Sequence, residues 1–320
     1  MMGRVLTFFD PLVRLLLVAI VAASLLPVSG QGAVIARIVS DVAIFLLFLL
    51  NGLRLPRSKV FTGLRHLRFL LPLIVFVFGV MGLVGWFVSA RADGLLPASV
   101  ALGFLFLGVL PSTVQSATAY TSLAGGNVAN SVVAAAVLNI LGVFISAPII
   151  ALVVSGGVAG LDLGTLERIG MILLLPFLLG QMLQGWLGPL VADRKRLFSL
   201  MDRFAIAIAV YVAFSGAVVQ GLWTFISLGE WLVLLGLVGL MLAVGFIGAW
   251  ALGGALGLLR ADRISFLFAG AQKSIAMGAP LAAVLFAPEV AGLILLPVLI
   301  YHLVQLIISA PLASRFTRQG

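Results

Sequence analysis

The sequence predicts an all-α polytopic membrane protein with about ten transmembrane helices. Hydrophobic residues make up 63% of the 320-residue chain and charged residues only 9%, whereas a soluble domain carries about 25% charged residues. The apolar runs are long and unbroken, without the alternation that a membrane β-barrel requires. At about 20 residues for each span, these runs use up nearly the whole chain, so we expect no soluble domain.

The formal net charge of +9 reflects membrane topology, and we expect no nucleic-acid partner. Most of the 19 Lys and Arg residues fall in predicted loops on one side of the membrane. Only Arg37, Arg91 and Arg168 fall on the other side, and Lys273 lies within a span. The positive-inside rule therefore predicts a multi-pass protein of the plasma (inner) membrane with both termini cytoplasmic. The absence of cysteine excludes disulfides and thiolate metal sites.

Five spans are predicted in residues 1–160. Arg4 and Arg14 flank an apolar run that ends at Pro27. This run is similar to a signal peptide, but it works equally well as a first span, which we favour because the chain stays densely hydrophobic afterwards. The next four spans are predicted at residues 33–53, 69–88, 96–123 and 128–154. Asp41 is expected near the outer end of the second span, and the fourth span is expected to be kinked or unwound near Pro111.

Five more spans are predicted in residues 161–320, at 170–187, 204–219, 231–259, 264–286 and 290–312. The ninth of all these spans is expected to be interrupted between Gly270 and Pro280, and a basic loop at 193–203 precedes the seventh. Because each half has an odd number of spans, the second half enters the membrane upside down. We therefore expect an inverted 5+5 repeat in which helices four and nine are symmetry mates.

Two polar stretches lie at membrane depth, one in each half. Residues 111–131 read PSTVQSATAYTSLAGGNVANS and carry almost no large aliphatic side chain, and residues 268–281 read FAGAQKSIAMGAPL. Such segments are tolerated only where protein buries them or where they line a wet cavity. Interrupted hydrophobic segments at corresponding places of two halves indicate the binding site of a secondary transporter.

The candidate substrate- or ion-binding residues come from these two stretches. They are Ser112, Thr113, Gln115, Ser116, Thr118, Thr121, Asn127, Ser131, Gln272, Lys273 and Ser274. The glutamines could instead join crossing helices, and single hydroxyls could bond back to the helix that Pro111 interrupts. His302 and Gln305 share a face of the tenth span, where a lone histidine is more often a satisfied core residue.

Lys273 is the most informative single residue. An unpaired ammonium group at mid-bilayer costs at least about 2.5 kcal/mol, so it needs partners or a function. In one interpretation neighbouring carbonyls satisfy it and it locks the break in helix nine. In the other it occupies or neighbours a site for a cation or an anionic substrate.

The same motifs carry a family resemblance. With the Gly126-Asn127-x-Ala129-x-Ser131 hairpin and the Gly270-x-Gln272 segment, the whole chain resembles the bile acid:sodium symporter family. It is most similar to a bacterial branch resembling the orphan member 7 of solute carrier family 10, which FLLFLLNGLRL in span two also fits. The resemblance implies ten helices in an inverted repeat, a panel and a core domain, and discontinuous helices four and nine that cross at the binding site.

Sodium coupling does not carry over directly from this resemblance. Sodium-dependent members share a glutamate where this chain has Phe268, and Lys273 replaces their asparagine. If sodium binds, the resemblance leaves Ser131 and Gln272 as its ligands, although a hard cation needs several oxygens. Our hypothesis is that the Lys273 ammonium stands in for a sodium ion, so that transport is independent of sodium or coupled to protons.

The sequence thus predicts a secondary transporter of small organic anions that works by alternating access. Half-helix N-termini would present positive dipole ends to a carboxylate or sulfate. A channel-like uniporter and a non-transporting regulatory membrane protein are the alternatives. We do not expect an enzyme, because no nucleophile, base and orienting group occur together and no HExxH motif or P-loop is present. The expected partners are the anion and the lipid bilayer, with the chain a monomer or homodimer, and no cofactor is expected beyond a coupling Na⁺ or H⁺.

Overall fold

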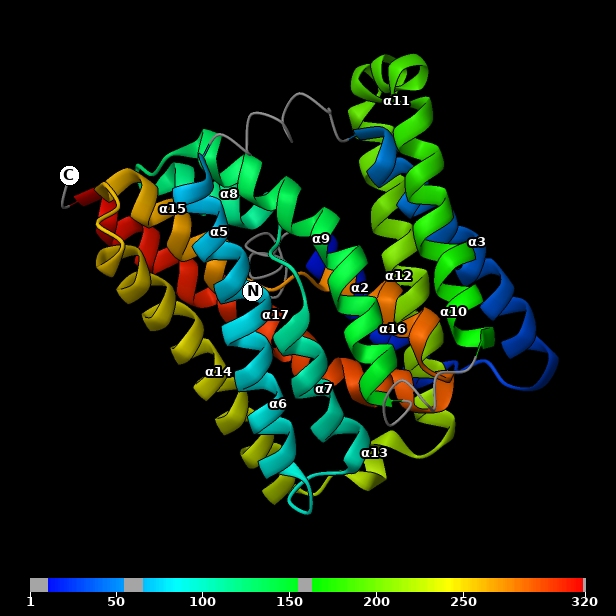
Figure 1. Ribbon diagram of the computed structural model, residues 1–320. Coiled ribbons are helices and arrows are strands. Elements are labelled where there is room, and N and C mark those ends of the chain that lie inside the picture. Colours follow the sequence, from blue (N-terminus) through cyan, green and yellow to red (C-terminus); the bar gives the residue numbers. More distant parts are fainter. Residues whose placement is uncertain (1–10, 55–65, 155–162, 319–320) are drawn as a thin grey trace, which may run out of the picture. The chain divides into compact units, whose positions relative to one another are not determined.

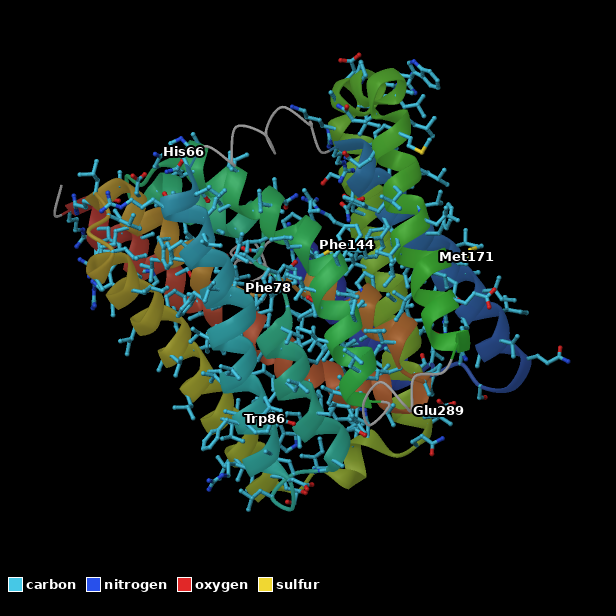
Figure 2. All side chains as sticks on the ribbon, viewed as in Figure 1. His66, Phe78, Trp86, Phe144, Met171 and Glu289 are labelled. Atoms are coloured by element: carbon cyan, nitrogen blue, oxygen red, sulfur yellow. The ribbon has the colours of Figure 1, made fainter. Side chains whose placement is uncertain are left out.

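The computed structural model describes residues 11–54, 66–154 and 163–318, and this part of the chain is helical without a strand (Figure 1). Seven helical segments in it are long and apolar enough to cross a membrane. They cover Gly30–Arg54, Leu67–Ala92, Val128–Val153, Glu167–Asp193, Lys195–Val219, Leu228–Ala255 and Pro288–Arg318. The all-α polytopic class is therefore confirmed. Large apolar side chains such as Trp86 and Met171 are more than half exposed (Figure 2), as the lipid-facing side chains of such helices are.

The chain forms two compact units, each assembled from segments of both sequence halves. Unit 1 consists of Met1–Leu55, Ala151–Phe225 and Ala279–Leu293. Its complete helices are α2 (Pro11–Leu25), α3 (Gly30–Arg54), α10 (Leu163–Ile169), η4 (Gly170–Leu174), α11 (Leu175–Asp193), α12 (Lys195–Val219) and α13 (Leu222–Phe225). It also contains the end of α9 (Val128–Val154), most of α16 (Ile275–Leu285) and the start of α17 (Pro288–Arg318). Glycines let α3 and α11 touch: a Cβ on Gly180 would lie 3.0 Å from the Cα of Gly52. Such small residues permit close helix packing in membranes.

Unit 2 consists of Pro56–Ile150, Ile226–Gly278 and Ile294–Gly320. Its helices are α5 (Leu67–Ile74), η2 (Val75–Val80), α6 (Met81–Ala92), α7 (Ala98–Val109), α8 (Gln115–Leu123), most of α9 (Val128–Val154), α14 (Leu228–Ala255), α15 (Arg260–Ala271), the first turn of α16 (Ile275–Leu285) and most of α17 (Pro288–Arg318). The η2 segment is a π-helical turn inside an otherwise α-helical span. Gly85 and Gly108 bring α6 and α7 together, because a Cβ on Gly108 would lie 3.0 Å from the Cα of Gly85.

Two details of the predicted topology are wrong. Asp41 does not open its span; it lies well inside α3 and pairs with Arg168, whose Nη2 is 2.9 Å from the Asp41 carboxylate. The α3 helix begins at Gly30, a few residues before the predicted start of the span. The stretch after Arg194, predicted as a basic loop, is the first part of α12. Pairing of Asp202 with Arg54 of α3 stabilises it there.

Candidate functional site

The fourth predicted span is broken as expected. Helix α7 ends at Val109, residues 110–114 are not helical, and α8 begins at Gln115. Pro111 has no N–H to donate to the preceding turn and disfavours the helical conformation of the residue before it, which explains the end of α7. The break is packed tightly, since a Cβ on Gly142 of α9 would lie 2.6 Å from the Pro111 ring.

The ninth predicted span is broken too, over a shorter stretch than the sequence indicated. Helix α15 ends at Ala271, residues 272–274 are extended or irregular, and α16 begins at Ile275. Gly270 and Pro280, the expected limits of the break, both lie within helices. Ser274 starts the second half-helix, because its Oγ accepts a hydrogen bond from the backbone N–H of Met277 over 3.3 Å.

The two breaks meet within unit 2. The backbone N–H of Ser274 donates to the Pro111 carbonyl over 2.9 Å. Thr113 Oγ1 donates to Gln272 Oε1 over 2.6 Å, and Ser116 Oγ lies 2.7 Å from each of these two oxygens. Gln272 is fully buried and its Nε2 donates to Ser309 Oγ of α17. Four predicted site residues, Thr113, Ser116, Gln272 and Ser274, are therefore brought to one place.

Lys273 lies in the centre of this crossing with no exposed surface. Its Nζ donates to three backbone carbonyls, those of Val77 at 2.9 Å, Gly108 at 2.7 Å and Leu110 at 2.8 Å. An ammonium group has three protons, so this set satisfies it completely. Within the described residues no carboxylate forms an ion pair with it. The ammonium is thus held by oxygen dipoles, as a bound metal cation would be.

The three carbonyls are available for reasons of local structure. Gly108 lies in the last turn of α7, where carbonyls lack an intrahelical partner, and Leu110 lies in the break itself. Val77 lies in η2, and π-helical turns of this kind occur frequently at functional sites. Lys273 therefore joins the ninth predicted span to the third and fourth. Its hydrogen bonds go to carbonyls in a π-helical turn, at a helix end and in the break that follows.

Helix α17 holds the backbone of the second break. The Lys273 N–H donates to Gln305 Oε1 over 2.8 Å, and Gln305 Nε2 donates to the Lys273 carbonyl over 3.0 Å. His302 Nδ1 lies 2.8 Å from that same Nε2. Tyr301 Oη donates to the Ala271 carbonyl over 2.6 Å. Sequence reasoning grouped His302 with Gln305 but missed Tyr301 and Ser309, although all four recur at helical spacing on one apolar span.

A separate group of hydroxyls joins α8 to α9. Ser131 Oγ lies 3.3 Å from Thr118 Oγ1 and 3.4 Å from Thr121 Oγ1. Ser131 and Thr121 are fully buried. No hydrogen bond in the described chain links this group to Gln272, the other predicted sodium ligand.

The hairpin after α8 is fastened to the start of α15 by Asn127. Its Nδ2 donates to Asp262 Oδ1 over 2.8 Å, and its Oδ1 caps α9 by accepting from the Asn130 N–H over 3.1 Å. Asn130 Nδ2 also donates to Asp262 Oδ1, and Ser265 Oγ donates to the Asn127 carbonyl. Asp262 and Asn130 were not among the predicted site residues: Asp262 lies outside both polar stretches, and Asn130 lies inside the first but was not singled out.

The side chains of two predicted site residues, Gln115 and Ser112, form no hydrogen bond to the second break. Gln115 is exposed at the start of α8, and no hydrogen bond joins it to Gln272. Ser112 is fully buried, and its main contact is through the backbone: its carbonyl accepts from Asn139 Nδ2 over 3.0 Å. Of the two glutamines, only Gln272 therefore joins the crossing helices by a side-chain hydrogen bond.

An apolar helical chain in which two interrupted helices meet at buried polar side chains has the architecture typical of membrane transporters. A profile of the SBF-like CPA transporter family matches residues 10–318, and the chain belongs to this family.

Three relatives illustrate the range of the similarity. "Uncharacterized protein PA2026" of Pseudomonas aeruginosa is 38% identical over 95% of this chain and 92% of its own length. "Putative symporter YfeH" of Escherichia coli is 35% identical over 99% of this chain and 95% of its own length. "Sodium/bile acid cotransporter 7" of Rattus norvegicus is 24% identical over 93% and 89%, respectively.

Proposed function

We propose that the protein is a secondary transporter of small organic anions that works by alternating access without binding sodium. The observation that carries this proposal is the position of the Lys273 ammonium, which takes three backbone carbonyls at the crossing of the two broken helices. A cation supplied by the chain itself would keep the crossing intact through every transport step.

The transport activity is supported by the family and by the names of two relatives. YfeH is named as a symporter and the rat protein as a sodium/bile acid cotransporter. A bile acid is an organic anion, which is the substrate class we propose here. The N-termini of the half-helices α8 and α16 carry positive dipole ends suited to a carboxylate or sulfate. Lys273 adds positive potential there but not a direct contact, because it is fully buried on carbonyls.

The residues present do not fit a sodium site. Gln272 Oε1 already lies within hydrogen-bonding distance of Thr113 and Ser116, and Ser131 belongs to a different group of hydroxyls. Among the described residues no cluster of His, Asp and Glu side chains could hold a metal ion. A hard cation prefers six or more oxygens including carboxylates. These features favour a transport cycle that is independent of sodium or that uses protons.

The finer architecture is part of the same proposal. Residues 1–160 and 161–320 would form the inverted 5+5 repeat, with α7–α8 and α15–α16 as the paired broken helices. Unit 1 would serve as the panel and unit 2, which contains both breaks, as the core. Both termini would be cytoplasmic in the inner membrane, because that orientation places most Lys and Arg inside. Alternating access would then move one unit relative to the other while the crossing stays intact.

Uptake into proteoliposomes tests the proposal. Purified protein is reconstituted and the uptake of a labelled organic anion, selected by a thermal-shift screen, is measured with and without a sodium gradient. We expect saturable uptake that does not respond to sodium. Lys273→Met is expected to abolish it, whereas Arg315→Met at an exposed position of α17 should not.

Three outcomes would contradict the proposal. Uptake that requires a sodium gradient and survives the loss of Lys273 would overturn sodium independence. Non-saturating flux would indicate a channel-like uniporter. The absence of flux for every anion that stabilises the protein would favour a regulatory membrane protein.

A further inference from the structure

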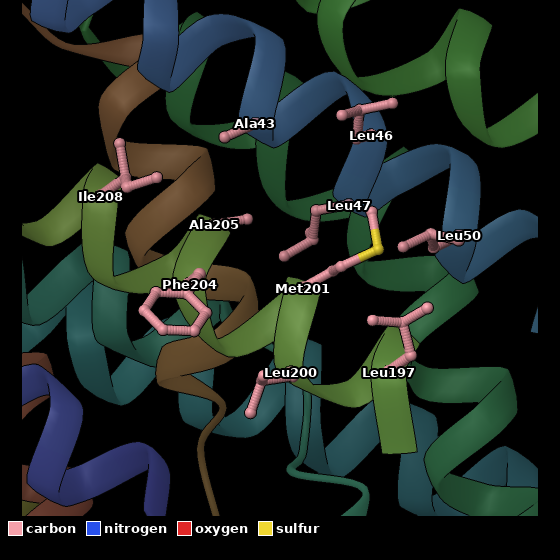
Figure 3. A pocket seen from close by; sticks show the side chains of 10 residues that line it. All are labelled: Ala43, Leu46, Leu47, Leu50, Leu197, Leu200, Met201, Phe204, Ala205 and Ile208. Carbon is pink, nitrogen blue, oxygen red and sulfur yellow. The ribbon is translucent and has the colours of Figure 1, made fainter. Parts of the chain in front are cut away.

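An apolar groove lies between α3 and α12 in unit 1 (Figure 3). Its volume is about 240 Å³, and ten apolar side chains line it. Four of them come from α3 between Ala43 and Leu50, and six come from α12 between Leu197 and Ile208. On both helices the lining residues recur three or four positions apart, so each helix contributes one continuous face. The groove runs for about 10 Å along α3, given the rise of 1.5 Å per residue.

One end of this groove is basic. Leu50 and Leu197 lie at the same end in Figure 3. Arg54 follows Leu50 by one helical turn on α3, and Arg196 precedes Leu200 by one turn on α12, so both continue the lining faces beyond this end. Lys195 and Arg196 are exposed there. The groove therefore passes from an apolar channel to a group of cationic side chains.

An ion pair near this end leaves the local charge positive. Arg54 Nη1 donates to Asp202 Oδ2, and Arg203 follows Asp202 on α12. Arg54 Nη2, Arg203 Nε and Asp202 Oδ1 lack partners among the described residues, but they are buried inside the protein, so a ligand in the groove does not reach them. Two guanidinium groups beside one carboxylate add positive charge near this end, which favours an anionic group such as a phosphate.

We propose that this groove binds an anionic glycerophospholipid such as phosphatidylglycerol. One acyl chain lies between α3 and α12, and the phosphate lies against Arg54, Lys195 and Arg196. Basic pockets between transmembrane helices recognise anionic lipid headgroups in this way. The sequence offered only a topological interpretation of these charges. The structure adds an apolar groove that ends at these basic residues, and this juxtaposition indicates an anionic lipid as their ligand.

Native mass spectrometry of the full-length protein tests the headgroup part. The protein in detergent is titrated with phosphatidylglycerol and with phosphatidylcholine carrying the same acyl chains. We expect tighter binding of phosphatidylglycerol. Each basic residue near a membrane surface contributes about fivefold to binding of an anionic lipid, so Lys195→Gln combined with Arg196→Gln should weaken it on the order of twentyfold. Arg315→Gln combined with Arg318→Gln, which removes the same charge from exposed positions of α17, should change it less than twofold.

A second pair of variants tests the groove itself. Ala43→Phe fills the channel from α3, whereas Val42→Phe adds the same ring to an exposed position outside it. We expect Ala43→Phe alone to abolish retention of phosphatidylglycerol. Equal retention of both lipids, or equal effects of the two phenylalanines, would overturn the proposal. So would thermal stabilisation by inorganic phosphate as strong as that by the lipid, or a dimer that Ala43→Phe dissociates, since these indicate a free anion or a second copy as the occupant.

Discussion

Thr113 Oγ1 donates to Gln272 Oε1 over 2.6 Å, although 159 residues separate them in the chain. Each residue lies in the break of a different interrupted helix, outside regular helical structure. Together with the Ser274–Pro111 backbone bond and the Lys273 ammonium, this contact joins the two breaks into one structural unit. Four predictions follow from how this crossing is held together.

Loss of the ammonium should destabilise the fold. Lys273→Met keeps most of the side-chain length but leaves the carbonyls of Val77, Gly108 and Leu110 buried without their donor. Each unpaired buried group costs about 1–3 kcal/mol, so we expect the free energy of unfolding to fall by about 3 kcal/mol or more. Thermal unfolding in detergent measures this change. Arg315→Met at an exposed position of α17 is the control, and equal melting temperatures for the two variants would contradict the prediction.

The contact between the breaks should appear as energetic coupling. Thr113→Val and Gln272→Leu each remove one partner of the same buried bond. We expect each to lower the free energy of unfolding by about 1–3 kcal/mol. The double variant should lose less than the sum of the two, by about 0.5–3 kcal/mol, because the second change removes a bond already broken. Strict additivity in this double-mutant cycle would show that the two side chains do not interact.

The backbone of Lys273 should depend on one side chain of α17. Gln305→Met removes both the acceptor for the Lys273 N–H and the donor to its carbonyl. Two buried backbone groups then lose their partners, so we expect a loss of about 2 kcal/mol in stability. The same substitution at the exposed Gln115 should change stability by less than about 0.5 kcal/mol. Chemical denaturation of both variants checks this difference, and a neutral Gln305→Met would disprove the role of α17.

Two glycine substitutions should have opposite effects. Alanine is about 1 kcal/mol more favourable than glycine inside a helix where space allows. No atom lies within 4 Å of a Cβ built on Gly236, so Gly236→Ala should be neutral or stabilising. A Cβ on Gly108 would lie 2.5 Å from the Met81 carbonyl oxygen, so Gly108→Ala must push α7 away from α6 and displace a carbonyl that binds Lys273. We expect it to lower both the melting temperature and anion uptake, and an unchanged melting temperature would argue against this packing.

Some parts of the site were predictable because their signal is local. Pro111 removes a backbone hydrogen bond from a helix, and a run of polar side chains at membrane depth is unfavourable unless it is buried in protein, so both breaks could be placed from the sequence. The narrower limits of the second break could not, since Gly270 and Pro280 are tolerated within helices whose neighbours satisfy the freed groups. Gln115 appeared equivalent to Gln272 by position alone, but its side chain is exposed.

The sequence by itself determined the apolar helices, their two interruptions and the presence of a cation between them, because hydropathy, proline and charge act over a few residues. Only the tertiary structure decided what that cation binds. Its acceptors belong to a π-helical turn at Val77 and to the frayed end of α7 at Gly108 and Leu110, and no local pattern marks Val77 as distorted. A backbone carbonyl is present at every residue, so its availability depends on how distant helices pack and not on residue type.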